Sequence, residues 1–264
     1  MLYANGIGPL KMPKNRLRAA KVLNKIDMIT LRDSDSLEVL SEIGATEPPA
    51  LVTADAAFGI KNTEQFKGKE LLKLLGLENK PFFCISVRSW EILPKNFEEQ
   101  MANYADKMSV EYGYSALFTS MQPQKDTAIT KRIMALMKQP SYFTGEVLSV
   151  NTILGICQEA QFMVAMRLHA AIYAIKCAKP VIGLIYDPKI KGVLSDFGQR
   201  YLIDVENAEA ERLMEFSQEI IENSAAISQG LAEKNMIVEK LAAKNVELAY
   251  KLIKNEVLAG DYDE

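Results

Sequence analysis

Short apolar runs alternate with segments of helical periodicity along this chain, and this alternation constrains the fold more than any other feature. Each run has the length of one strand, and the amphipathic segments between runs are long enough to cross back over a sheet. This rhythm is typical of βα units with parallel strands. Of the 264 residues, 48% are hydrophobic, which is enough to bury a substantial core. The clearest runs are Pro81–Val87, Ser115–Ser120, Phe162–Met166 and Pro180–Tyr186.

The other expected elements follow the same rhythm. Further strands are expected at Met28–Leu31 and Ala50–Ala54, with a weaker one near Tyr142. Beyond Asn207 the pattern is charged and helical to about Leu258. The remaining expected helices are Lys14–Ile26, one capped by Asp33 and running to about Ile43, Asn96–Glu111, Asp126–Lys138, Val150–Glu159 and one opening directly behind Met166.

A polar stretch at Leu77–Pro81 separates two series of these units. We therefore predict an α/β protein with two Rossmann-like domains, a partial N-terminal one over residues 1–78 and a C-terminal one with long terminal helices over residues 79–264. Parallel sheets bind ligands outside the carboxyl ends of their strands, so a cleft between the domains is the expected site. Because about 80 residues are few for a doubly wound domain, we expect the first domain to be incomplete.

Composition excludes several kinds of partner. The 31 basic and 34 acidic side chains give a net charge of -3, which provides no global field to attract nucleic acid. Cys84, Cys157 and Cys177 lie in apolar surroundings without CxxC spacing, so neither a metal site nor a disulfide framework is expected. No apolar run has the roughly 20 residues of a membrane-spanning helix, and no signal peptide is recognisable. A cytoplasmic location is the expectation.

The only histidine, His169, follows a strand run and falls in the first turn of the next expected helix. Active sites of parallel sheets lie at such strand ends. Arg167 stands two residues earlier, and the free N–H groups of a helix start favour a bound anion. The sequence thus predicts a cation, a proton carrier and an anion site together. The alternative is a structural histidine beside a solvent-facing arginine.

Arg88 occupies the equivalent position after the run Pro81–Val87. It is a candidate second anion clamp, and the alternative is a surface arginine paired with Glu91. A substrate that carries both a carboxylate and a phosphate would need two such arginines, each able to bind bidentately.

Asp187 lies at another expected strand end, before Pro188 at the first position of a helix. Capping that helix is the simpler role for Asp187. The alternative is that it orients a sugar hydroxyl or a catalytic group, while Lys189 adds positive charge near a phosphate.

Six basic residues and no acidic one occur within Lys11–Lys25. A solvated helix surface is the default interpretation of this basic face. The sharper alternative is contact with anionic lipid headgroups or with a lipid-diphosphate-linked acceptor. Gly6 and Gly8 nearby either form a turn or let the backbone approach a phosphate.

Six short blocks follow one another along the chain: Tyr3–Pro9, Ile29–Ser36, Thr53–Phe58, Ile85–Trp90, Met166–Ala174 and Ile185–Ile190. In this order they resemble the polysaccharide pyruvyl transferases of the bacterial cell-wall type. The Arg-Leu-His and Tyr-Asp-Pro-Lys blocks are the most specific. The similarity extends over essentially the whole chain, although the family's glycine-containing first segments are missing, so we expect a truncated beginning and leave the activity of this chain open.

The resemblance implies a GT-B-like arrangement of two domains. It also implies phosphoenolpyruvate as donor substrate without a further cofactor, and a ketal-linked pyruvate on an N-acetylmannosamine of a cell-wall polymer as product. The matching donor-site positions are Arg88, Arg167, Leu168 and His169. A membrane-proximal reaction on a lipid-linked saccharide would follow. The alternatives are a glycosyltransferase or sugar epimerase that uses a nucleotide-sugar, and a non-catalytic remnant that binds a partner through its C-terminal helices.

Overall fold

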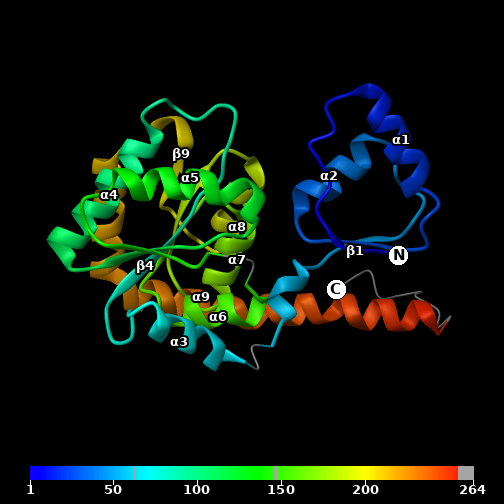
Figure 1. The fold of residues 1–264 in the computed structure, drawn as a ribbon. Coiled ribbons are helices and arrows are strands. Elements are labelled where there is room, and N and C mark those ends of the chain that lie inside the picture. The colour runs from blue at the N-terminus through cyan, green and yellow to red at the C-terminus, as the bar shows by residue number, and fades with distance from the viewer. Residues whose placement is uncertain (62–63, 146–147, 255–264) are drawn as a thin grey trace. The chain divides into compact units, whose positions relative to one another are not determined.

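The computed structural model describes residues 1–61, 64–145 and 148–254, and the chain forms two compact units (Figure 1). The first unit holds residues 1–60 together with the chain from Asn235 onward, and the second holds Lys61–Lys234. Each unit contains its own parallel sheet. The predicted α/β class with two parallel sheets is therefore confirmed.

The first unit is built on a three-stranded sheet in the order β1-β2-β3. Ile29 and Leu31 of the central strand pack with Leu40 in its small core. The predicted cap is present, because the Asp33 carboxylate accepts the backbone N–H of Ser36 at 2.8 Å. The elements are β1 (Leu2–Asn5), α1 (Pro13–Leu23), β2 (Ile29–Leu31), α2 (Ser34–Glu42), β3 (Ala50–Val52) and the 3-10 helix η1 (Ala56–Gly59).

The last part of the long helix α9 (Ala210–Ile253) belongs to the first unit. Asn245 of this helix is fully buried, accepts the Thr53 hydroxyl at 2.8 Å and donates to the Ala54 carbonyl at 3.2 Å. A buried amide is stable when its donors and acceptors are paired in this way. The helix is thereby fastened to the carboxyl end of β3.

The helix α9 has 44 residues, with charged side chains along its length. Within the described ranges of the chain, no helix combines the length and the apolar character needed to cross a membrane. The predicted helical end near Leu258 lies outside the described residues.

The second unit is built on a six-stranded parallel sheet in the order β6-β5-β4-β7-β8-β9. The chain fills one half of the sheet outward from β4, returns to the middle at β7 and then fills the other half, which is the doubly wound order of Rossmann-like folds. The strands are β4 (Phe82–Ser86), β5 (Ser115–Phe118), β6 (Ser141–Phe143), β7 (Met163–Ala165), β8 (Val181–Ile185) and β9 (Leu202–Asp204). The helices are α3 (Gln65–Leu74), α4 (Phe97–Tyr112), α5 (Pro123–Leu136), α6 (Val150–Glu159), α7 (Leu168–Lys176), α8 (Pro188–Asp196), the 3-10 helix η2 (Val205–Asn207) and the first part of α9.

The main core of the second unit lies where the central strands meet α4, α5 and the start of α9. Phe83 and Ile85 of β4 are fully buried there, with Met101 of α4, Ile129 of α5 and Leu213 of α9. Both faces of a parallel sheet must be covered, and this explains why the strand runs read as continuous apolar stretches instead of alternating ones.

The observed division differs from the predicted boundary between residues 78 and 79. The helix α3 precedes that boundary, yet it packs closely on α6 and belongs to the second unit. The end of α9 follows the boundary, yet it belongs to the first unit. The sequence prediction also omitted α3 and the edge strand β9. The assignment of α3 to the second unit and of the end of α9 to the first depends on contacts between distant parts of the chain, which local patterns do not show.

Two glycines allow α3 and α6 to touch backbone to backbone. A Cβ added to Gly68 would lie 2.5 Å from the carbonyl carbon of Gly155. We expect Gly68→Ala to lower the free energy of unfolding by about 1–3 kcal/mol, since the two helices must move apart.

The matched control for this substitution is Gly230→Ala in α9, where an added Cβ meets no atom within 4 Å. Alanine should stabilise that helix by up to about 1 kcal/mol. Thermal unfolding of both variants measures the contrast. Equal melting temperatures would show that the close approach of α3 and α6 is not needed.

Candidate active site

The strands β4 and β7 lie side by side at the centre of the second sheet, where the direction of winding reverses. Ser86 at the end of β4 is in register with Ala165 at the end of β7. In open α/β sheets this switch point is where ligands bind, outside the carboxyl ends of the strands. Arg88 follows one of these strands by two residues, and Arg167 follows the other by two. The structure therefore brings both predicted arginines to the same rim of the sheet.

Arg88 reaches across the end of β7. Its Nη1 donates a hydrogen bond to the Tyr186 hydroxyl at 2.8 Å, and Tyr186 follows β8, which flanks β7 on the side away from β4. The guanidinium carbon lies 5.1 Å and 5.2 Å from the ring centroids of Tyr186 and Trp90, within the range of a cation–π contact. No ion pair joins Arg88 to Glu91 among the described residues. The predicted surface pair is thus replaced by an aromatic clamp.

Arg167 is bound to a buried carboxylate that the sequence analysis did not identify. The Nε and Nη2 atoms of Arg167 donate to Oδ1 of Asp126, with an Nε–Oδ1 distance of 3.1 Å. Asp126 lies in the first turn of α5, and its side chain is 0% exposed against 12% for Arg167. Its other oxygen accepts the backbone N–H groups of Met121 and Gln122 at 3.0 and 2.8 Å. Asp126 therefore ties the end of β5 to the end of β7, across β4.

The start of α7 is where the sequence predicts an anion site. Arg167 is the N-cap residue of this helix, and Leu168 and His169 are its first two residues. In the described structure no side chain caps this helix start, and no acidic residue lies in its first turn. Its first N–H groups and the positive end of the helix dipole are therefore suited to an anion. The imidazole of His169 is exposed, and its ring centroid lies 6.0 Å from that of Tyr173, one turn along α7.

Three hydroxyl groups form a row along the same edge of the sheet, starting at β4, the neighbour of β7. Ser86 ends β4, and Thr119 and Thr144 directly follow β5 and β6. These three positions continue the registers of β4 with β5 and of β5 with β6 by one residue, so their side chains share one face of the sheet. All three are at least nine-tenths buried, and their hydroxyl oxygens have no hydrogen-bond partner in the described part of the protein. Buried polar atoms without partners are uncommon and costly, so this row needs an explanation.

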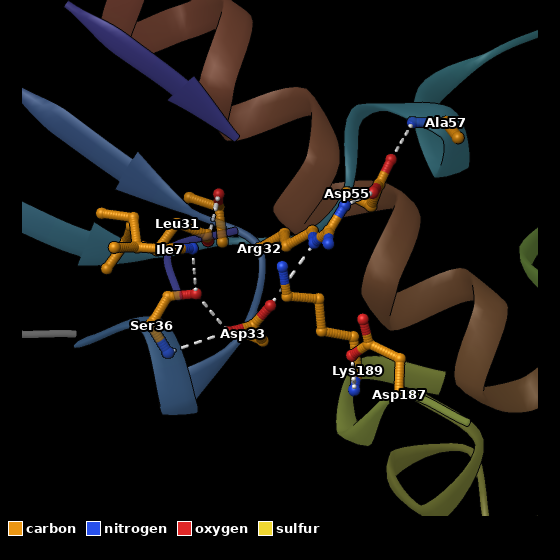
Figure 2. Close-up of polar contacts among 10 residues, drawn as sticks. Ile7, Leu31, Arg32, Asp33, Ser36, Asp55, Ala57, Asp187 and Lys189 are labelled. Atoms are coloured by element: carbon orange, nitrogen blue, oxygen red, sulfur yellow. Dashed lines mark hydrogen bonds and ion pairs between the residues drawn. The ribbon is translucent and has the colours of Figure 1, made fainter. Parts of the chain in front are cut away.

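Asp187 and Lys189 lie just after β8, the neighbour of β7 in the sheet. The Asp187 carboxylate accepts the backbone N–H of Lys189 at 3.0 Å and caps α8 (Figure 2). The capping role that the sequence favoured for Asp187 is confirmed. Both side chains are half-buried at the rim on which Arg88 and Arg167 lie.

The three cysteines of the second unit are free thiols. Burial raises the pKa of the Cys177 thiol to about 12, and it raises the pKa values of Cys84 and Cys157 well above the ordinary value. A thiol needs to be deprotonated to act as a nucleophile. Burial therefore favours the protonated thiol at all three positions, which disfavours their use as nucleophiles.

The first unit has a charged network of its own at the carboxyl ends of its strands (Figure 2). Arg32, directly after β2, donates to Asp33 at 3.4 Å and to Asp55 at 3.1 Å, and Asp55 in turn accepts the backbone N–H of Ala57 at 3.0 Å. The carboxylates hold the guanidinium in one orientation, with a side-chain exposure of 14%. Neither Arg32 nor Asp55 was predicted from the sequence as a functional residue.

Gly6 makes room for this network. A Cβ added to Gly6 would lie 2.7 Å from Nε of Arg32, so a larger residue would displace the guanidinium from its present position. Gly8 has a φ of +105°, a backbone conformation that favours glycine. The two glycines therefore have structural roles in the turn after β1, in line with the simpler of the two predicted interpretations.

A family model described as polysaccharide pyruvyl transferase matches residues 1–188. The chain belongs to the polysaccharide pyruvyl transferase family. The match includes every residue of the rim described above except Lys189, and it confirms the family that the six sequence blocks resembled. The bacterial cell-wall type within the family stays a prediction. A comparison with curated proteins found no match.

Solved structures with the same fold include enzymes that bind nucleotide-sugars. HepE of Anabaena in complex with UDP-glucose has a TM-score of 0.64 at 12% identity, over 96% of this chain and 71% of that one. The UDP-GlcNAc 2-epimerase of Neisseria meningitidis, bound to UDP-GlcNAc, has a TM-score of 0.64 at 13% identity, over 85% and 62%. A glycosyltransferase of Rickettsia africae has a TM-score of 0.58 at 14% identity, over 96% and 69%. These likenesses confirm the GT-B-like fold class of this pyruvyl transferase family member, and at such identities they concern the fold alone.

Asp126, Tyr186 and the hydroxyl row are the parts of the rim that the sequence analysis missed. A signal for the row was present, because a hydroxyl residue stands near the end of each of three consecutive strand runs, at Ser86, Thr119 and Thr144. Asp126 carried no comparable signal, since an aspartate in the first turn of a helix normally faces solvent near the helix dipole. Only the fold shows that it is buried beside an arginine 41 positions later.

Proposed function

We propose that this protein transfers a pyruvyl group from phosphoenolpyruvate to a sugar as a ketal and releases phosphate, with an N-acetylmannosamine of a cell-wall polysaccharide precursor as the acceptor. The observation that carries the proposal is the meeting of Arg88, Arg167 and the start of α7 at the switch point of the sheet, in a chain of the pyruvyl transferase family. Phosphoenolpyruvate carries a carboxylate and a phosphate, and this rim offers two guanidinium groups and a helix start to receive them.

In the proposed reaction His169 supplies the proton. Proton transfer to the methylene carbon of phosphoenolpyruvate turns it into a methyl group and leaves an oxocarbenium centre at the adjacent carbon. One sugar hydroxyl attacks that carbon, the carbon–oxygen bond to phosphate breaks, and a second hydroxyl closes the ketal. One hydroxyl proton restores His169 and the other leaves with phosphate. A histidine is suited to move protons in both directions near neutral pH.

The other rim residues bind the charged and polar groups of the substrates in this scheme. Arg88, Arg167 and the backbone N–H groups at Leu168 and His169 stabilise the leaving phosphate and the carboxylate. We assign the unpaired hydroxyls of the row Ser86, Thr119 and Thr144 to the remaining oxygens of the donor substrate, because these buried groups have no hydrogen-bond partner in the described part of the protein. Lys189 adds charge near the phosphate, and Asp187 orients a sugar hydroxyl with the carboxylate oxygen that does not cap α8.

We assign the acceptor to the first unit, whose own rim carries Arg32, Asp33 and Asp55. Carboxylates and an arginine at a strand end can bind sugar hydroxyls, and the Asp33 carboxylate can accept a further hydrogen bond beyond those described above. The donor is a charged metabolite, so we place the reaction in the cytoplasm, at the inner face of the membrane when the acceptor is lipid-linked.

The direct test is to incubate the chain with phosphoenolpyruvate and a lipid-linked saccharide that ends in N-acetylmannosamine. We expect saccharide-dependent release of phosphate, and a product whose mass has increased by one pyruvyl ketal. UDP-glucose and UDP-GlcNAc serve as the competing donors. Release of UDP, with no use of phosphoenolpyruvate, would replace the proposal by a nucleotide-sugar enzyme.

Binding of the donor can be measured without turnover. A ligand that binds the folded state at 100 times its Kd stabilises it by about 2.7 kcal/mol, which raises the melting temperature. We expect this shift with phosphoenolpyruvate and not with either UDP-sugar. The absence of a shift with every donor, together with no transfer, would favour the non-catalytic remnant.

A further inference from the structure

The outward side of α1 in the first unit carries positive charge only. Ala20 and Leu23 are buried on the inner side, and the helix contains no acidic residue. Exposed cations on the outer side are Lys14, Arg18, Lys21 and, just beyond the helix, Lys25. Arg16 is not part of this set, because it lies at another angle and pairs with Glu42 at 2.8 Å.

Two large apolar side chains border these cations. Successive residues of an α-helix are rotated by about 100°, which puts the four cations on one arc with Leu17 at one edge and Val22 at the other. Leu17 is 65% exposed and Val22 is 63% exposed. On an ordinary solvated helix, apolar residues gather on the buried side and charges of both signs face water. The cationic surface of α1, defined as Lys14, Leu17, Arg18, Lys21, Val22 and Lys25, departs from this pattern in both respects.

We propose that this cationic surface of α1 docks on a membrane that contains anionic lipids. The four cations would lie among the headgroup phosphates, while Leu17 and Val22 enter the boundary with the acyl chains. The alkyl chains of lysine and arginine are long enough to keep the charged groups in the headgroup layer when the helix inserts below it. This is the arrangement of interfacial helices, which combine a basic face with apolar residues beside it.

Charge complementarity requires a polyanion, and the exposed Leu17 and Val22 favour a lipid surface among the polyanions. Nucleic acid would use the cations but would leave Leu17 and Val22 in water, because its contacts at the backbone are polar. The chain as a whole has a net charge of -3, so the attraction must come from a local surface such as this one and not from the overall charge. The docking surface is independent of the proposed reaction, since it uses no residue of either rim.

The test is binding to sedimenting vesicles, made either of phosphatidylcholine alone or of equal parts of phosphatidylcholine and phosphatidylglycerol. We expect binding to the mixed vesicles only, and a loss of binding at high salt, because exposed charges are screened. The variant K14Q/R18Q/K21Q should weaken binding at least about tenfold. The variant L17S/V22S should weaken it about threefold or more, since the apolar contact is lost.

Matched controls come from the second unit, where the same chemistry is exposed without forming a cationic arc. K73Q/K80Q/K131Q removes three exposed cations, and L74S/I92S removes apolar side chains that are 84% and 65% exposed. Both controls should bind like the wild type, and all four variants should keep its melting temperature. Equal binding to the two kinds of vesicle, or equal losses in the α1 variants and the controls, would overturn the proposal. So would a protein that ignores vesicles but binds DNA through α1.

Discussion

Replacing His169 with alanine should lower the rate of pyruvyl transfer by about 10²–10⁴-fold, the usual contribution of a positioned acid–base group. The imidazole is exposed at the start of α7, so its removal leaves no cavity in the core. The same substitution should therefore change the melting temperature very little. Saccharide-dependent release of phosphate from phosphoenolpyruvate measures the effect on transfer. Thermal unfolding measures the effect on stability.

The control for this variant is Tyr173→Phe, one turn further along α7. It keeps the ring that lies 6.0 Å from His169 and removes only the hydroxyl. We expect transfer by this variant to stay within about threefold of the wild type, because a phenol hydroxyl is not the proton carrier in the proposed chemistry. Transfer at an undiminished rate without the imidazole would refute the role of His169 and require another acid.

Removing the Asp126 carboxylate should destabilise the second unit more than the loss of any surface ion pair. The Asp126→Ala variant leaves the largely buried Arg167 without its counter-ion and frees two backbone N–H groups. Breaking a buried pair in this way costs about 3–5 kcal/mol. At about 2–4 °C for each kcal/mol in a unit of this size, the melting temperature should fall by roughly 10 °C. Thermal unfolding measures the loss.

Glu98→Ala provides the matched control, because Glu98 forms an ion pair with the exposed Arg132 at 2.7 Å. Exposed pairs contribute about 0–1 kcal/mol, so this variant should melt close to the wild type. Asp126→Asn should lie between the two, since the amide oxygen can still accept the N–H bonds. If Asp126→Ala were no more costly than Glu98→Ala, the buried pair would have no structural importance.

Much of the second unit could be predicted because its parallel strands are buried on both faces. Continuous apolar runs mark such strands, and the helix expected over Val150–Glu159 has the bounds of α6. The edge strand β9 escaped prediction because it has only three residues, and its middle one alone is buried. The helix α3 escaped because the prediction took the region before Leu77 as the end of the first domain. Its packing on α6 depends on Gly68 and Gly155, which are 87 positions apart.

The candidate site was predictable to the extent that it lies at strand ends. The rule that ligands bind outside the carboxyl ends of parallel strands was enough to select Arg88, Arg167 and His169. The partners of the two arginines were not predictable, because Asp126 and Tyr186 reach them across an intervening strand. Such pairings depend on strand order, which cannot be predicted from local sequence patterns.

The two contacts that cross intervening strands have a consequence for affinity. A free arginine side chain samples many rotamers, and a ligand that fixes it must offset the entropy that is lost. Here Asp126 already holds Arg167, and Tyr186 with Trp90 already holds Arg88. A small anion makes few contacts, so its affinity gains most when the arginine side chains that bind it are already ordered. A larger nucleotide makes enough contacts to order these side chains itself.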